Sequence, residues 1–250
     1  MIQPALMRAE AIARLSGAQI VAYCCTFDSR ATGGADAKNA WLAWVRDSLD
    51  RIVASTRAAG IDVEVQLEWN EDWRTALTDA AAASDCDLLV KASSKHSVMH
   101  RKFAATSDWM LLRQAVCPTL LVTDKPPKGQ RILLAGIKLR PEDVEHERLN
   151  QSIVDLSHYI SDVAGFDMHA VTAYRGDGGH FDRQRFADSC RLPRNRVHSI
   201  EGLPQNALAK AAVDLDADTI VIGYVDSSDS AEKLIDQVDT DILVLPSSSD

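Results

Sequence analysis

The sequence contains an internal repeat, and this repeat restricts the possible folds more than any other feature. The motif DCDLLV at 85–90 corresponds to DADTIV at 216–221, and an alanine-rich segment precedes each motif. Further along, CPTLLV at 117–122 corresponds to TDILVL at 240–245. Two copies of one structural unit are therefore predicted to follow each other in the chain.

Short apolar strands alternate with amphipathic helices in both copies. This order predicts an α/β fold in which helices cover both faces of a parallel sheet. We expect strands at 19–25, 63–67, 87–91, 119–122, 131–137, 168–173 and 197–200, with two more within 220–246. We expect helices at 5–15, 39–58, 73–83, 107–114, 146–164 and 204–215, and a short one between the last two strands.

Proline and glycine mark the boundary between the copies. The segment DKPPKGQ at 124–130 has the composition of a linker. We therefore assign 1–124 to a first domain, 125–130 to the linker and 131–250 to a second domain. The second copy has five expected strands and the first has four, because the chain opens directly on the helix PALMRAEAIARL.

Composition and charge exclude several classes of function. The net charge is −9 at neutral pH, whereas binding to nucleic acids or membrane surfaces depends on a concentrated positive field. No apolar run reaches the ~18 residues of a membrane span, and no signal peptide is recognisable. The five cysteines are an odd number without CxxC spacing, which favours reduced thiols and a cytoplasmic location.

Several motifs together resemble those of the tandem universal stress proteins, most closely the two-domain E-type branch. The motifs are QPALMRA, DLLVKASSKHS, TSDWMLLRQAVCPTLLV, EGLPQNAL and SAEKLIDQVDTDILVL. The resemblance covers almost the whole chain. It implies two flavodoxin-like (adenine nucleotide alpha hydrolase-like) units, each with five parallel strands in the order 3-2-1-4-5, packed as a pseudo-dimer.

In this strand order the first copy lacks strand 1, which is the centre of the sheet. Its strands 2 and 4 would then carry unpaired backbone groups, at about 1 to 3 kcal/mol for each buried group. We therefore expect a further apolar strand to be encoded upstream of Met1. Alternatively, a strand from a neighbouring molecule fills the slot, or strands 2 and 4 move together into a four-stranded sheet.

The resemblance also implies a place for ATP, at the switch point between strands 1 and 4. Nucleotide-binding relatives use an Asp at the end of strand 1 and a loop G-x2-G-x9-G-[S/T] after strand 4. In the first copy Ala92, Lys95 and Ala105 stand at the glycine positions, and the hydroxyls of Thr106 and Ser107 remain. Without glycine, backbone N–H groups do not turn inward toward phosphate.

The second copy departs further from the pattern. Gly223 stands at the first glycine and Asp226 at the second, and the rest of the loop is deleted as far as Ser230. Gly136 and Ile137 occupy the position of the nucleotide-binding Asp. We expect both sites to have lost tight ATP binding. The candidate crevice residues are Ala92, Lys95, Thr106, Ser107, Gly136, Gly223, Asp226, Ser227, Ser228 and Ser230.

The loop of the first copy concentrates positive charge on an acidic protein. It is either an anion or partner-docking patch or a solvated loop. His96 and His100 have the spacing of two metal ligands on a helix, but no third ligand accompanies them, so no metal site is predicted. The patch consists of Lys91, Lys95, His96, His100, Arg101 and Lys102.

A glycine-rich segment at 175–186 contains Asp177, His180 and Asp182. These side chains are compatible with a metal site or an acid/base pair. The glycines instead favour a crossover loop.

The resemblance, together with the departures from its ATP-binding pattern, implies a non-enzymatic stress-response protein without a cofactor, which binds an unidentified protein partner or small ligand. No serine has a partner base or an oxyanion donor in view, so no catalytic residue is assigned. The alternatives are an ATP-binding switch or slow ATPase and a carrier of an apolar small molecule. We expect a monomer, because the last strands of the two copies, PTLLV and DILVLP, can cover each other's edges.

Overall fold

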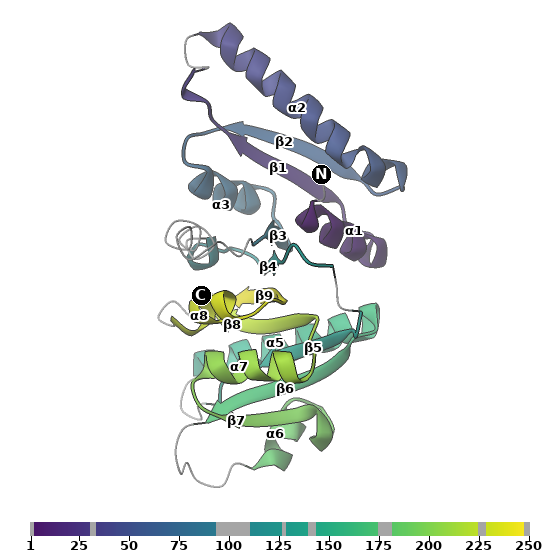
Figure 1. Ribbon diagram of the computed structural model, residues 1–250, viewed down its shortest axis with the longest axis vertical. Helices are drawn as coiled ribbons and strands as arrows, with labels where there is room; N and C mark the ends of the chain where they lie inside the picture. The colour runs from purple at the N-terminus through teal and green to yellow at the C-terminus, as the bar shows by residue number, and fades with distance from the viewer. Residues whose placement is uncertain are drawn as a thin grey trace. The chain divides into compact units, whose positions relative to one another are not determined.

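The computed structural model (Figure 1) describes residues 3–30, 34–93, 111–126, 129–139, 144–174, 182–224 and 229–247. Strands alternate with helices throughout these ranges, and most strand neighbours are parallel. The predicted α/β class is therefore confirmed. Contacts divide the chain into two compact units, 1–86 and 87–250, and each is described by itself.

Unit 1 is a two-stranded parallel sheet with three helices. Its elements are α1 (Pro4–Ser16), β1 (Ile20–Thr26), α2 (Ala35–Ala58), β2 (Val63–Trp69) and α3 (Trp73–Ala83). β1 pairs with β2 from Ile20 opposite Val63 to Thr26 opposite Trp69. A small core forms where Val53 of α2 packs on Val63 and Val65.

Unit 2 contains a seven-stranded sheet in the order β3-β4-β9-β8-β5-β6-β7. Its strands are β3 (Leu89–Ala92), β4 (Thr119–Val122), β5 (Ile132–Gly136), β6 (Asp167–Tyr174), β7 (Val197–Glu201), β8 (Thr219–Tyr224) and β9 (Asp241–Pro246). Its helices are α5 (Val144–Ala164), α6 (Arg183–Ser189), α7 (Pro204–Asp214) and α8 (Asp229–Gln237), with a short 3-10 turn at Arg194–Arg196.

β5 lies at the centre of the second copy, between β6 and β8. The order β7-β6-β5-β8-β9 is the 3-2-1-4-5 order expected for this half. Leu133, Leu134 and Ala135 of β5 are 0% exposed, as expected for a parallel strand covered on both faces. Before β5, the carboxylate of Asp218 accepts the N–H groups of Gly129 (3.0 Å) and Ile132 (3.2 Å).

The last strands of the two copies pair with each other, as predicted. β4 runs antiparallel to β9, with Thr119 opposite Val244 and Leu121 opposite Ile242. This pairing places β3 and β4 of the first copy in unit 2. The contact boundary therefore falls after Cys86 and not at the linker. The repeat boundaries at 124 and 131, and the monomeric state, stay predictions.

The strands of the first copy lie in two different sheets. Within the described residues, β1 has β2 as its strand neighbour and β3 has β4. No described strand takes the central position that β5 has in the second copy, in agreement with the predicted gap. The alternative of a single four-stranded sheet is wrong for these residues, because β1 and β3 belong to separate sheets.

The prediction of a loop throughout 175–186 is wrong at its end. α6 begins at Arg183 because the carboxylate of Asp182 accepts the N–H groups of Gln184 (2.9 Å) and Arg185 (3.0 Å). Asp182 is therefore a helix cap, whereas Asp177 and His180 lie outside the described residues.

Asp241 links the two copies at the end of the β4–β9 junction. It is 7% exposed, and its Oδ1 accepts the backbone N–H (2.9 Å) and the hydroxyl (3.2 Å) of Thr123. We expect Asp241→Ala to lower the free energy of unfolding by about 1 to 3 kcal/mol, because Thr123 loses a charged acceptor. Urea denaturation monitored by circular dichroism measures this loss.

Asp239→Ala is the matched control. The Asp239 carboxylate pairs with Lys125 at a more exposed position, where their side chains are 30% and 62% exposed. A surface ion pair of this kind contributes about 0 to 1 kcal/mol. Equal losses in the two variants would show that the Asp241 bonds do not fasten the junction.

Candidate functional site

The switch point of the second copy lies at the carboxyl ends of β5 and β8, where the strand order reverses. Two candidate residues line it, because Gly136 ends β5 and Gly223 lies near the end of β8. A Cβ atom added to Gly136 would lie 2.8 Å from Cδ2 of Leu208 in α7. One added to Gly223 would lie 2.3 Å from Cδ2 of Leu149 in α5.

These two leucines approach the sheet from opposite faces. A Cβ atom at Gly136 would meet both Leu208 and the side chain of Ile222, so these lie on one face of the sheet. Gly223 follows Ile222 in β8, and successive residues of a strand point to opposite faces, so Leu149 lies on the other face. Figure 1 shows α7 in front of this sheet and α5 behind it. Apolar side chains therefore press on both glycines, and helix packing alone accounts for the absence of a side chain at Gly223.

The chain that leaves β5 is fastened to α5 through Lys138. Its backbone N–H donates to Asn150 Oδ1 (3.1 Å), and its carbonyl accepts from Asn150 Nδ2 (2.7 Å). Its Nζ lies 2.6 Å from Nε2 of His146, which is 9% exposed. An ammonium group thus lies just beyond Gly136 and Ile137, the positions where the resemblance implies a carboxylate in nucleotide-binding relatives.

The remaining candidate residues are only partly placed. Ala92 is exposed at the end of β3, and Lys91 lies in the same strand. Ser230 lies in α8, but its side chain is outside the description. The structure therefore brings together Gly136 and Gly223 and does not test the rest. Outside the described residues lie Lys95, His96, His100, Arg101, Lys102, Thr106, Ser107, Asp226, Ser227 and Ser228.

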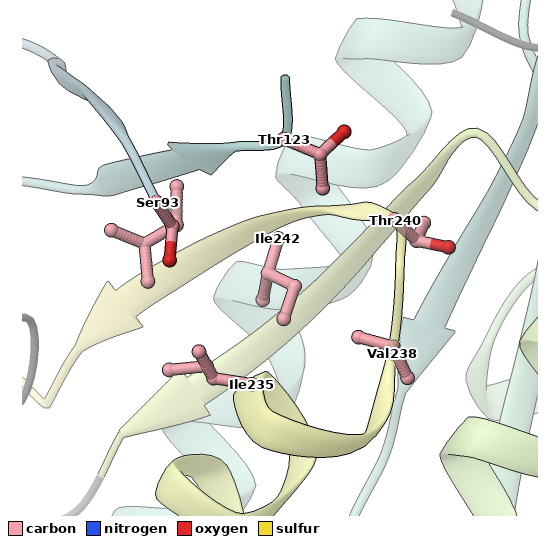
Figure 2. Close-up of a pocket in the computed structure, with 7 residues that line it drawn as sticks. Ser93, Thr123, Ile235, Val238, Thr240 and Ile242 are labelled. Carbon is pink, nitrogen blue, oxygen red and sulfur yellow. The ribbon is translucent and has the colours of Figure 1, made fainter. Parts of the chain in front are cut away.

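A small cavity lies beside the β4–β9 junction, and no sequence motif pointed to it. Figure 2 shows Ile235 and Val238 from α8 and its end facing Ile242 of β9. The space open to the centre of a water molecule is about 20 Å³, which is room for about one water. This cavity is too small for a nucleotide or a fatty acid chain. Its lining residues are Ser93, Leu121, Thr123, Ile235, Val238, Thr240 and Ile242.

A histidine pair on β6 and β7 was also missed, because only the register of the strands brings it together. His169 Nδ1 lies 3.0 Å from His198 Nε2, and the rings stack with centroids 5.3 Å apart. Burial lowers the pKa of both imidazoles. A proton on His169 would lower the pKa of His198 further, and Arg183 acts in the same direction.

The fold defines a doubly wound, flavodoxin-like α/β protein. Part of the chain also matches a known family. Residues 3–123 match the model of the universal stress protein family. Universal stress protein E of Photorhabdus laumondii is 24% identical over 288 aligned residues, which cover 97% of this chain and 90% of that protein. Universal stress protein E of Escherichia coli K12 is 25% identical over 219 residues, or 75% and 69% of the two chains.

Solved structures share the fold over nearly the whole chain. A functionally unknown protein from Pseudomonas aeruginosa PAO1 has a TM-score of 0.75 at 21% identity, covering 97% of this chain and 87% of that one. A universal stress protein from Archaeoglobus fulgidus DSM 4304 also has a TM-score of 0.75, at 12% identity, covering 98% and 92%. Among the described residues, no helix has the length and apolar character of a membrane span.

The packing role of Gly223 is testable with a double-mutant cycle. We expect Gly223→Ala to lower the free energy of unfolding by about 1 to 3 kcal/mol, because the new methyl group overlaps Leu149. Leu149→Ala alone is expected to cost about 2 to 5 kcal/mol. In the Leu149→Ala background, Gly223→Ala should cost less, because the space is vacated. Purely additive losses in urea denaturation would contradict the packing role.

The histidine pair predicts a loss of stability in acid. Because the folded-state pKa of each imidazole lies below its ordinary value of 6.5, the unfolded chain binds protons first as the pH falls. Stability contributed by the neutral pair is present above about pH 6.5 and decreases toward the lower folded-state pKa. We expect His198→Gln to flatten the dependence of the unfolding free energy on pH between about 7 and 5. An unchanged slope would exclude the pair as its source.

Proposed function

We propose that this chain is a tandem universal stress protein of the E type, acting in the cytoplasm as a non-enzymatic stress-response protein. It binds a protein partner or a small ligand and does not turn over a substrate. The family match over 3–123, the likeness to Universal stress protein E along the chain and the repeated α/β pattern support this proposal.

For the second copy, the packing at Gly136 and Gly223 is the main support for the proposed loss of tight ATP binding. Leu208 and Leu149 occupy the space next to these glycines, one on each face of the sheet. A phosphate would need backbone N–H groups exposed at this point. For the first copy the support comes from the sequence, since Ala92 and Lys95 stand where relatives are expected to have glycine.

We expect no ATP binding with micromolar affinity. Isothermal titration calorimetry of the full chain with ATP and Mg²⁺ should give no dissociation constant below about 10 μM, which corresponds to roughly −7 kcal/mol. A tighter constant would replace the proposal by a nucleotide-binding switch or slow ATPase. Leu149→Ala and Leu208→Ala serve as comparison variants. If one of them binds ATP weakly and the unchanged chain does not, the replaced leucine is the side chain that closes the crevice at the ends of β5 and β8.

Thermal-shift assays with AMP and with fatty acids test the other alternative, a carrier of an apolar small molecule. A ligand present at 100 times its dissociation constant stabilises the folded state by roughly 2.7 kcal/mol. Stabilisation by a fatty acid would favour a carrier of apolar molecules. Native mass spectrometry of the purified chain then identifies what it retains from the cell.

A further inference from the structure

Two imidazole side chains meet on one face of the sheet in unit 2. Val171 of β6 lies opposite His198 of β7, and His169 comes two residues before Val171, so both histidines point to the same face. Nδ1 of His169 lies 3.0 Å from Nε2 of His198. β6 and β7 lie at the end of this sheet opposite β3, and the backbone pairing between them holds the two residues in register.

The separation of the two nitrogens suits two ligands of one metal ion. Imidazole nitrogens lie at about 2.0 to 2.1 Å from Zn²⁺, and Cu²⁺ and Ni²⁺ also bind imidazole. At this bond length two nitrogens are about 3.0 Å apart on neighbouring corners of a square or octahedron, and about 3.4 Å apart in a tetrahedron. The 3.0 Å between the inner nitrogens of His169 and His198 matches the first arrangement. Square and tetragonal coordination is the geometry that Cu²⁺ and Ni²⁺ prefer.

Both rings can present a lone pair to such an ion. A metal binds neutral imidazole, and burial lowers the pKa of both histidines, so the neutral forms dominate at about pH 7. In the present contact one inner nitrogen carries the hydrogen. When this ring takes its hydrogen on the outer nitrogen instead, which is Nε2 of His169 or Nδ1 of His198, both inner lone pairs become free and no net proton is released.

Water molecules supply the remaining ligands. Both rings are only half-buried, so a hydrated ion can reach them from solvent. In the part of the chain that the structure describes, no group of three or more His, Cys, Asp or Glu is arranged around one metal position. The protein therefore contributes two ligands, and the ion keeps water at its other positions.

The charged side chains around the pair leave one positive charge unbalanced. Asp167 favours a positive charge on His169, Arg196 opposes it, and these two side chains form an ion pair with each other. Arg183 opposes a positive charge on His198, and its Nη2 donates to a backbone carbonyl at the start of β7 (2.7 Å). Of the described charges that act on the two rings, that of Arg183 is therefore the one that weakens the binding of a cation.

We propose that His169 and His198 together bind a divalent transition metal ion of the Cu²⁺ and Ni²⁺ type. This inference rests on the proposed function, because it names a class of small ligand that the chain binds. The histidines lie on β6 and β7, whereas the ATP titration tests the crevice at the ends of β5 and β8. Either proposal can therefore fail alone.

Paramagnetic broadening in NMR spectra locates the ion on the unchanged chain. The probe is Ni²⁺, added stepwise to the isotope-labelled full chain at about pH 7.5, where imidazole is neutral. We expect the amide signals of His169, Ala170, Val197 and His198 to lose intensity first. Mg²⁺, which prefers oxygen ligands, should leave these signals unchanged. First losses at the cysteines or at residues 96–100 would overturn the proposal.

Calorimetric titration with Ni²⁺ tests the two ligands. We expect His169→Gln and His198→Gln each to weaken binding by about tenfold or more, since losing a group that only supports a ligand already costs about 10- to 100-fold. The matched control replaces His96 and His100 by Gln, which removes two imidazoles with the spacing of ligands on a helix and should leave the affinity unchanged. Circular dichroism verifies that each variant is folded. Binding that survives in the single variants and disappears in the control would refute the assignment.

Arg183→Gln tests the surroundings of the site. Removing the unbalanced cation should tighten Ni²⁺ binding by about threefold to tenfold at low ionic strength, and less at high salt. Arg185→Gln makes the same charge change two residues further along α6, at another exposed arginine, and should have a smaller effect. No tightening, or an equal change in the two variants, would contradict a metal site beside Arg183.

Discussion

A strand at the centre of a parallel sheet leaves water only when both of its edges are hydrogen-bonded and both of its faces are covered. β5 meets this condition, since β6 and β8 flank it and the side chains of Leu133 and Leu134 are completely buried on opposite faces. The second copy is arranged around this strand. The first copy has no described counterpart, and its strands are divided between two sheets. Among the described residues, the copy with a central strand forms one continuous sheet, and the copy without a described central strand does not.

Much of the fold was predictable because its signals are local. The apolar periodicity predicted α3 and β4 with the bounds that the structure has. α6 was missed because it has only seven residues and depends on one capping aspartate inside a glycine-rich segment. The histidine pair could not be predicted, because His169 and His198 meet only through the register of β6 and β7.

At the candidate site, a residue that matches a binding motif has a different physical reason for its presence. Gly223 matched a position of the phosphate-binding loop, and the sequence alone supplied no other reason for a glycine there. The structure supplies one, since Leu149 packs directly on its backbone. The distance between α5 and β8 depends on two segments that are far apart in the chain, so the sequence around Gly223 does not reveal it.

The β4–β9 junction has a consequence for folding during translation. Thr123 and Asp241, which meet at this junction, are separated by 118 positions in the chain. At a synthesis rate of about 5 to 20 residues per second, β4 waits roughly 6 to 24 seconds for its partner to be made. During this interval the edge of β4 that later pairs with β9 has no strand partner. Nascent chains are therefore most prone to aggregation, and most in need of a chaperone, after the first copy has been translated and before the second is complete.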